Sequence, residues 1–157
     1  LYSGRVLLLP FLEQMALYDR FDKTKAWDSP ENKAISETSI KLFLDPSSTN
    51  GNSKRSDYVF VTGTGTIFEG DKSIRLSEIT HGTSKTLLVV ETSRGESSSA
   101  EPVDWNADTG TLPPSNRKNL TICGFADGSV RAIPPTAIQG MEKDLAGRND
   151  GRAVMVP

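Results

Sequence analysis

The chain has 157 residues, 36% of them hydrophobic, and its 18 basic and 20 acidic side chains leave a formal net charge of −2. A chain of this length and composition buries a core and folds as a globular protein rather than staying disordered. No run of Lys and Arg exceeds two residues, which argues against a nucleic-acid-binding surface. We therefore expect one domain over residues 1–157 and no nucleic-acid partner.

The first predicted elements are helical. Pro10 suits the first turn of a helix, and the apolar residues after it recur at spacings of three and four, which predicts a helix over about residues 10–20. Its apolar face is expected to pack on a sheet. A second helix is predicted to begin with Ser29 as N-cap and Pro30 in the first position, and to end before Asp45.

The middle of the chain is predicted to form strands between polar loops. Residues 58–62 are β-branched and aromatic, which favours a strand. Residues 85–91 are the most hydrophobic run in the chain and are predicted to form the central strand. Residues 46–56 and 93–101 read as polar loops, and a brief extended piece is expected around residues 103–105.

A β-hairpin is predicted over residues 120–133. Asp127 and Gly128 are the pair that a two-residue type I′ turn favours, because both of its central residues need positive φ. Apolar residues flank the pair on both sides, and a short helix over residues 137–145 is expected to follow. Early helices followed by strands, joined by turns too short for βαβ crossovers, predict an α+β fold with a mainly antiparallel sheet.

One segment has the spacing of a cation-binding loop. Asp104, Asn106 and Asp108 place three oxygen-bearing side chains at alternate positions, as calcium loops do. The match to an EF-hand is imperfect, because Gly110 falls one place late and Ser115 stands where a bidentate Glu belongs. The segment thus predicts either a calcium site or a polar turn with local Asx-type hydrogen bonds. No other cofactor is expected.

The remaining residues do not predict an enzyme. His81 is the only histidine, and no Gly-x-Ser-x-Gly elbow accompanies it, so we expect a loop histidine rather than a catalytic base. Residues 63–65 resemble a phosphate-binding loop only superficially, because the Gly-Lys-Ser/Thr ending is missing. Cys123, the only cysteine, is predicted to be a small buried side chain in a strand.

Four segments together carry a resemblance to a known family, and they occur in the family's order. They are residues 5–14 (RVLLLPFLEQ), 56–66 (SDYVFVTGTGT), 79–91 (ITHGTSKTLLVVE) and 125–131 (FADGSVR). With these blocks, roughly residues 3–133 resemble a bacterial family of pseudopilin-like proteins, expanded in planctomycetes and largely of unknown function.

The family's C-terminal hallmark is a His, nine residues and then Asp-Gly. Asp127 and Gly128 match the end of this hallmark, whereas Arg117 stands at the position of the His. Arg cannot shuttle protons near neutral pH, so a chemical role of the His would be lost in this chain. A basic side chain that forms a salt bridge with a carboxylate remains open for either residue.

The resemblance implies a head domain of pilin type, with N-terminal helices packed on the sheet. It also implies a type IV pilin-like start upstream of Leu1, with a short leader, a cleavage site and a hydrophobic helix that anchors the subunit in the membrane or packs it into a fibre. Major pseudopilins of type II secretion carry calcium in a C-terminal loop. The resemblance therefore also favours calcium as a ligand of Asp104, Asn106 and Asp108.

We therefore expect a non-enzymatic cell-envelope protein, a subunit or accessory of a type II secretion or type IV pilus-like assembly. Its partners would be other pseudopilin-like subunits or envelope proteins, and its location the extracytoplasmic face, in the periplasm or at the surface. The alternative is an extracytoplasmic solute- or glycan-binding module. That function needs Trp27 or Trp105 to be exposed in a concave pocket. The other possibility for each tryptophan is that it packs in the core.

Overall fold

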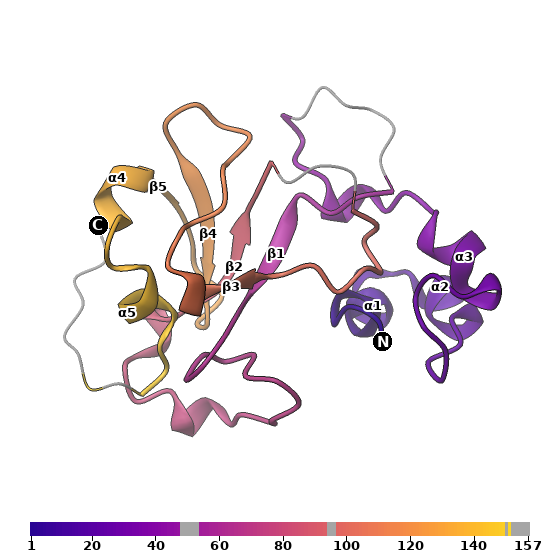
Figure 1. Ribbon diagram of the computed structural model, residues 1–157, viewed down its shortest axis with the longest axis horizontal. Helices are drawn as coiled ribbons and strands as arrows, with labels where there is room; N and C mark the ends of the chain where they lie inside the picture. The colour runs from indigo at the N-terminus through magenta and orange to yellow at the C-terminus, as the bar shows by residue number, and fades with distance from the viewer. Residues whose placement is uncertain (48–53, 94–96, 150, 152–157) are drawn as a thin grey trace. The chain divides into compact units, whose positions relative to one another are not determined.

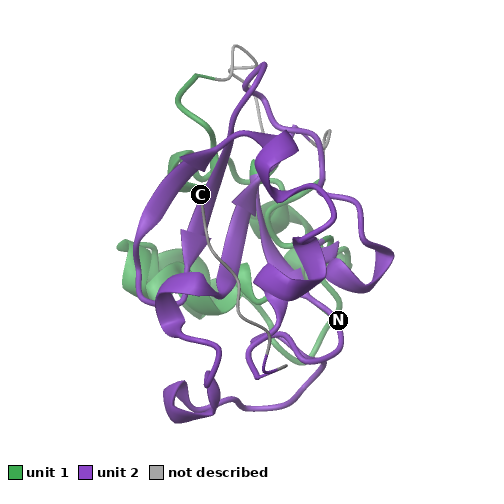
Figure 2. Ribbon diagram, turned by 90° about the vertical axis from the view of Figure 1, so that its left-hand side faces the viewer, with its two compact units in different colours: residues 1–57, 94–103 green, residues 58–93, 104–157 purple. Residues whose placement is uncertain are grey.

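The computed structural model describes residues 1–47, 54–93, 97–149 and 151. The chain forms two compact units: unit 1 comprises residues 1–57 and 94–103, and unit 2 comprises residues 58–93 and 104–157 (Figure 2). The sequence predicts one domain over residues 1–157, and this stays a prediction.

Unit 2 contains a five-stranded sheet (Figure 1). Its strands are β1 (Tyr58–Thr62), β2 (Leu87–Glu91), β3 (Trp105–Asn106), β4 (Thr121–Phe125) and β5 (Val130–Ile133), in the order β3-β1-β2-β4-β5. β3 pairs parallel to β1, and all other pairs are antiparallel. The structure confirms the predicted α+β class with a mainly antiparallel sheet, and β2 is the central strand as its apolar sequence predicted.

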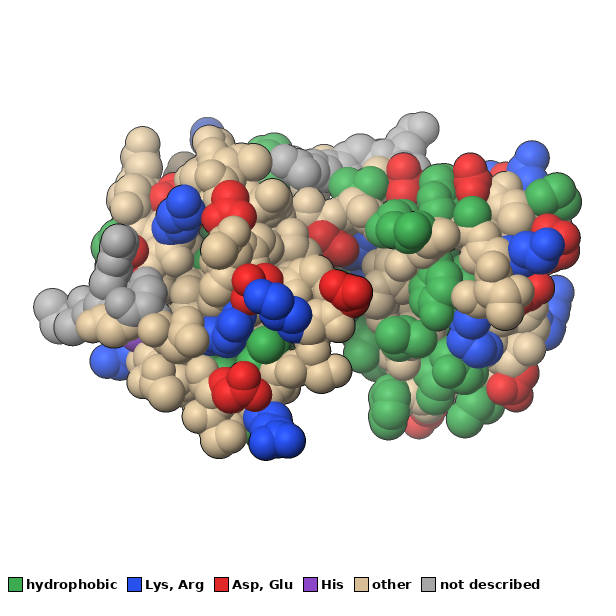
Figure 3. Space-filling model, turned by 60° about the horizontal axis from the view of Figure 1, so that its bottom comes forward, with side chains coloured by type: hydrophobic (Ala, Val, Ile, Leu, Met, Phe, Trp, Pro, Cys, Tyr) green, Lys and Arg blue, Asp and Glu red, His purple; other side chains and the backbone are tan. Residues whose placement is uncertain are grey.

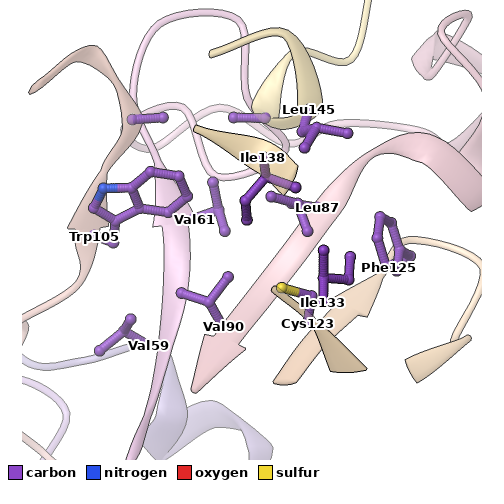
Figure 4. Close-up of a cluster of buried hydrophobic side chains, with 12 residues drawn as sticks. Val59, Val61, Leu87, Val90, Trp105, Cys123, Phe125, Ile133, Ile138 and Leu145 are labelled. Carbon is purple, nitrogen blue, oxygen red and sulfur yellow. The ribbon is translucent and has the colours of Figure 1, made fainter. Parts of the chain in front are cut away.

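The core of unit 2 lies on one face of this sheet (Figure 4). Val59 and Val61 alternate with less buried residues along β1, as period-two patterning requires. Trp105, Leu87 and Phe125 are each at most 1% exposed and supply the largest side chains of this core. Cys123 is fully buried in β4, which confirms the prediction of a small buried side chain in a strand.

The predicted hairpin is present, but its predicted turn is wrong. The amide of Gly128 donates to the Phe125 carbonyl and the amide of Phe125 donates to the Ser129 carbonyl, so the loop has three residues. Gly128 takes φ +83°, whereas Asp127 has no positive φ. A type I turn closed by one left-handed glycine therefore replaces the two-residue type I′ turn. Asp-Gly suits both turns, because in each of them Gly128 takes a positive φ.

Short helices complete unit 2. The single helix predicted over residues 137–145 is wrong, since the chain forms α4 (Pro135–Ile138) and α5 (Glu142–Ala146) with Gly140 between them. Both helices add to the core: Ile138 and Leu145 are fully buried. Single 3₁₀ turns lie at Leu76–Glu78, Thr83–Lys85 and Ala107–Thr109.

Unit 1 is built from short helices. These are α1 (Arg5–Leu8), a 3₁₀ helix (Leu9–Leu12), α2 (Met15–Arg20), α3 (Pro30–Ser36) and a 3₁₀ turn (Lys41–Phe43). The single helix predicted over residues 10–20 is wrong. Glu13 adopts φ +59°, a left-handed conformation that ends the 3₁₀ helix, and α2 begins two residues later. The apolar spacing continues across this break, which is why periodicity could not locate it.

The start of α3 agrees with the prediction. The side chain of Ser29 accepts a hydrogen bond from the Asn32 amide, and Pro30 occupies the first helical position. The helix is shorter than predicted, because it ends at Ser36 and only the turn Lys41–Phe43 precedes Asp45. Residues 48–53 and 94–96, which belong to the two predicted polar loops, lie outside the described residues.

A second hydrophobic cluster forms the core of unit 1. Val6, Leu9, Phe21 and Phe43 are among its buried members. Arg5, only 3% exposed, holds the segment after Ser98 to α1: its Nε donates to the Ser99 carbonyl, and its Nη2 donates to the carbonyls of Glu101 and Val103. Among the described residues, no helix is long and apolar enough to cross a bilayer.

Candidate functional site

The predicted calcium residues line a turn that runs from the chain before β3 into the following 3₁₀ turn. Their side-chain oxygens accept hydrogen bonds from the protein itself. Oδ1 of Asp104 accepts from the Phe60 amide at 3.0 Å, and Oδ1 of Asn106 accepts from the Asp108 amide at 2.9 Å. Oδ2 of Asp108 accepts from both the amide and the hydroxyl of Thr64, at 2.8 and 3.0 Å. The local Asx hydrogen bond that the sequence offered as the alternative reading is therefore present.

A glycine lets this turn approach the end of β1. At Gly63, with φ +126°, a Cβ atom would lie 2.8 Å from Oδ1 of Asn106 and 3.2 Å from Oδ2 of Asp108. The Thr64 donors lower the pKa of Asp108, and the Lys143 ammonium lies 3.8 Å from its Oδ1. In the part of the chain that the structure describes, no three His, Cys, Asp or Glu side chains are grouped to hold a metal. Calcium binding here stays a prediction.

Arg117 forms an ion pair with a buried carboxylate. Its Nε lies 3.2 Å from Oε2 of Glu91, whose side chain is fully buried at the end of β2. The Ile122 amide donates to the same oxygen at 3.3 Å. Of the roles left open for the basic residue at this position, the structure shows the salt bridge. The sequence could not predict this pair, because Arg117 and Glu91 lie 26 residues apart and the distance between two such side chains cannot be read from the sequence.

Asp127 closes the hairpin turn and does not meet Arg117. Its Oδ1 accepts from the amide and the hydroxyl of Ser129, at 2.9 and 2.6 Å, and these bonds lower its pKa. The whole of β4 separates it from Arg117, and five extended residues span about 17 Å. Arg117, Asp127 and Gly128 therefore support the two ends of one strand rather than a shared site.

His81 holds the segment that follows α5. Its Nδ1 lies 2.9 Å from the Gly147 carbonyl oxygen, and its amide donates to the Arg148 carbonyl. Because a carbonyl can only accept, Nδ1 carries the proton in this contact. Arg148 continues the attachment: its Nη1 donates to the Thr66 carbonyl and to Oε2 of Glu69. This attachment could not be predicted from the sequence, since Arg148 belongs to a polar stretch without periodicity.

An exposed hydrophobic surface covers the N-terminal helices of unit 1 (Figure 3). Of the nine large hydrophobic side chains exposed among the described residues, five lie within the first 15 positions. Leu7, Leu8, Phe11 and Met15, with Phe11 83% exposed, form what we call the apolar face. Val6 and Leu9 of the same helical stretch are buried in the core of unit 1. Because buried and exposed apolar residues alternate along this stretch, periodicity alone could not tell that the residues of the apolar face are exposed.

The two tryptophans differ in accessibility. Trp105 is fully buried in the core of unit 2, so it cannot stack on a ligand. Trp27 is partly buried in unit 1 and lines a cavity of about 330 Å³, which we call the Trp27 cavity. The sequence could not predict which tryptophan is accessible, because neither lies in a segment whose apolar residues recur with a regular period.

Comparison with known proteins gives one match. A family model described as a protein of unknown function (DUF1559) matches residues 2–117. The chain belongs to this family. The DUF1559 match ends at Arg117, so the hairpin residues Asp127 and Gly128 lie beyond it. No curated protein and no solved structure matches the chain.

Proposed function

We propose that this DUF1559 protein is a non-enzymatic, pseudopilin-like head that works by associating with other proteins. It would serve as a subunit or accessory of a type II secretion or type IV pilus-like assembly. Four sequence blocks in the order of pseudopilin-like proteins support this proposal, and the mainly antiparallel α+β fold is compatible with it.

The observation that carries the proposal is the apolar face. Leu7, Phe11 and Met15 are 48%, 83% and 51% exposed, although their chemistry favours burial. Contiguous exposed apolar patches on soluble domains usually mark surfaces that contact another protein or a membrane. Single exposed apolar residues need no such explanation, but these three fall within nine residues of the chain, in α1, the following 3₁₀ helix and the start of α2.

The occupant we propose for the apolar face is another pseudopilin-like subunit. The protein would then work at the extracytoplasmic side of the cell envelope, held there by an N-terminal hydrophobic helix of the full-length product. Other envelope proteins are the second class of partner for the same surface. Association through side chains alone requires no cofactor.

The test compares two double variants of the full-length protein in its own cells. L7E/F11E places two charges on the apolar face, whereas the matched control L76E/V130E places two charges on similarly exposed apolar residues of unit 2. We expect chemical cross-linking in intact cells to capture subunit contacts in wild type and control, and to lose them in L7E/F11E. Equal cross-linking in both variants, or a soluble cytoplasmic wild-type protein, would overturn the proposal.

A second function is favoured by one specific observation. We also propose that the protein binds a small solute or glycan, because Trp27 lines a cavity whose size is within the range of ligand pockets, about 300–1,000 Å³. This function uses a different surface of unit 1 from the apolar face. The two functions can therefore be separated by mutation.

A further inference from the structure

The Trp27 cavity is bounded by a fixed framework. The Trp27 amide donates to the Leu1 carbonyl at 3.0 Å, and the Trp27 carbonyl accepts from the Ser36 hydroxyl at 2.5 Å. These hydrogen bonds hold the backbone of Trp27, and its side chain is kept in place by packing on the hydrophobic cluster of unit 1. The indole is positioned before a ligand arrives, which reduces the entropy lost on binding.

Two buried serines join the sides of the cavity. Ser36 is 2% exposed and Ser98 is 9% exposed, and the Ser98 hydroxyl donates to the Ser36 carbonyl at 2.6 Å. The Ala100 amide donates in turn to the Ser98 hydroxyl. Two segments 62 residues apart in sequence are therefore connected at the cavity. The serine hydroxyl protons are committed to the protein, so recognition of a ligand falls to the other side chains.

Charged side chains of both signs line the Trp27 cavity. Three carboxylates, those of Asp28, Glu37 and Glu101, line the cavity together with the ammonium groups of Lys33 and Lys54. Nζ of Lys54 lies 3.2 Å from Oε1 of Glu37, in an exposed pair. A ligand with a full charge of either sign would therefore meet like charges at the cavity wall.

A neutral ligand rich in hydroxyl groups avoids this conflict. Each hydroxyl can donate to a carboxylate and accept from an ammonium group, and hydrogen bonds to charged partners are stronger than those between neutral groups. The apolar C–H face of a sugar ring fits an aromatic surface, where both lose contact with water. Carboxylates, ammonium groups and one indole are the side chains such a ligand requires.

We propose that the Trp27 cavity binds a neutral mono- or disaccharide, with one sugar ring against Trp27 and its hydroxyls bonded to Asp28, Glu101 and Lys33. This inference rests on the second proposed function, since it names the ligand class of the same site. It does not depend on the apolar face.

The test follows the two indole N–H signals of the ¹⁵N-labelled chain in heteronuclear NMR spectra. The probes are glucose, galactose, mannose, N-acetylglucosamine, maltose and cellobiose, with glucosamine and glucuronate as charged counterparts. We expect at least one neutral probe to shift the Trp27 signal saturably at millimolar concentration. The Trp105 signal, from a fully buried ring in unit 2, serves as the internal reference and should stay in place.

Two variants test the assigned contacts. Asp28→Asn and Glu101→Gln together should weaken binding of the active sugar at least tenfold, whereas Glu31→Gln, an exposed carboxylate that does not line the cavity, should leave it unchanged. An equal loss in both would overturn the assignment.

The outcomes also separate this inference from the function on which it rests. Shifts with glucosamine or glucuronate alone would overturn the neutral-sugar assignment and keep a solute-binding role. No shift of Trp27 with any probe would overturn both the inference and the glycan-binding function. The cross-linking test of the apolar face would be unaffected by either result.

Discussion

The guanidinium of Arg117 lies 3.2 Å from the carboxylate of Glu91, whose side chain is fully buried while that of Arg117 is 34% exposed. A buried carboxylate is costly unless a positive charge and hydrogen bonds compensate it. Arg117 reaches this carboxylate from the loop before β4, and the Ile122 amide of β4 bonds to the same oxygen. The pair therefore fastens the entry of the hairpin to the end of the central strand.

Removing this partner should destabilise unit 2. We expect Arg117→Met to lower the free energy of unfolding by about 2–4 kcal/mol, somewhat less than for a fully buried pair because Arg117 is partly exposed. Chemical denaturation measures the change. The exposed neighbour Lys118 is the matched control, and Lys118→Met should change stability by less than about 0.5 kcal/mol. Adding Glu91→Gln to Arg117→Met should recover part of the loss, and strict additivity of the two would contradict the coupling.

Glu69 should stabilise unit 2 at neutral pH and lose this effect in acid. Hydrogen bonds from Lys72 and Arg148 lower the pKa of Glu69 from its ordinary value near 4.5 to about 2. A carboxylate whose pKa is lower in the folded state stabilises the fold above its unfolded pKa, and this contribution disappears as the pH falls from about 4.5 to about 2. Glu69→Gln should therefore be less stable than wild type at pH 7, with the gap closing toward pH 2.

Urea midpoints at a series of pH values measure this gap. Glu31→Gln, which removes an exposed carboxylate of α3, is the matched control variant. A gap between wild type and Glu69→Gln that stays constant from pH 7 to pH 2 would show that the ion pairs of Glu69 contribute nothing to folding.

The thiol of Cys123 should be unreactive in the folded protein. Burial, and secondarily the negative charge of Glu91, raise its pKa to about 12. Since the thiolate is the reactive form, alkylation by iodoacetamide at pH 8 should be at least a hundredfold slower in the native chain than in denaturant. Mass spectrometry follows the reaction. Native labelling at the rate of the unfolded chain would mean that β4 opens readily.

Asn32 should control the loop that carries Trp27. Its side chain is fully buried, donates to the carbonyls of Asp22 and Ala26 at 2.9 Å each, and accepts from the Asp22 amide at 2.8 Å. Asn32→Ala leaves these backbone groups without that partner, so we expect a loss of about 2–4 kcal/mol in unit 1. Hydrogen exchange of the Asp22 amide should accelerate accordingly. Asn119→Ala, at an exposed position of unit 2, should leave this exchange rate unchanged.

Calcium remains a proposal for the turn that holds Asp104, Asn106 and Asp108. A cation bound only by the folded chain raises the melting temperature, so millimolar calcium after chelation should raise it in wild type and not in Asp108→Ala. Magnesium serves as the control for ionic strength. An identical melting temperature with chelator and with calcium would end the proposal, and the hydrogen bonds from Thr64 and the Asp108 amide would then be the whole role of these side chains.

The sequence by itself determined the α+β class, the strands around Val59 and Val89, the hairpin at Gly128 and the Ser29 cap. Each of these follows from local chemistry: β-branched and apolar runs, a glycine that tolerates positive φ, and a serine hydroxyl that accepts a hydrogen bond from a backbone amide in the first turn of a helix. Such signals act over a few residues, and tertiary contacts reinforced them here.

Only the tertiary structure decided the rest. The pairing of Arg117 with Glu91 joins positions 26 residues apart. The left-handed Glu13 breaks the helix although the apolar spacing in the sequence continues across it. Tertiary packing also exposed Phe11 while it buried Leu9, and made Trp27 a cavity wall and Trp105 a core residue. Burial depends on which distant segments cover a side chain, and neither periodicity nor residue type carries that information.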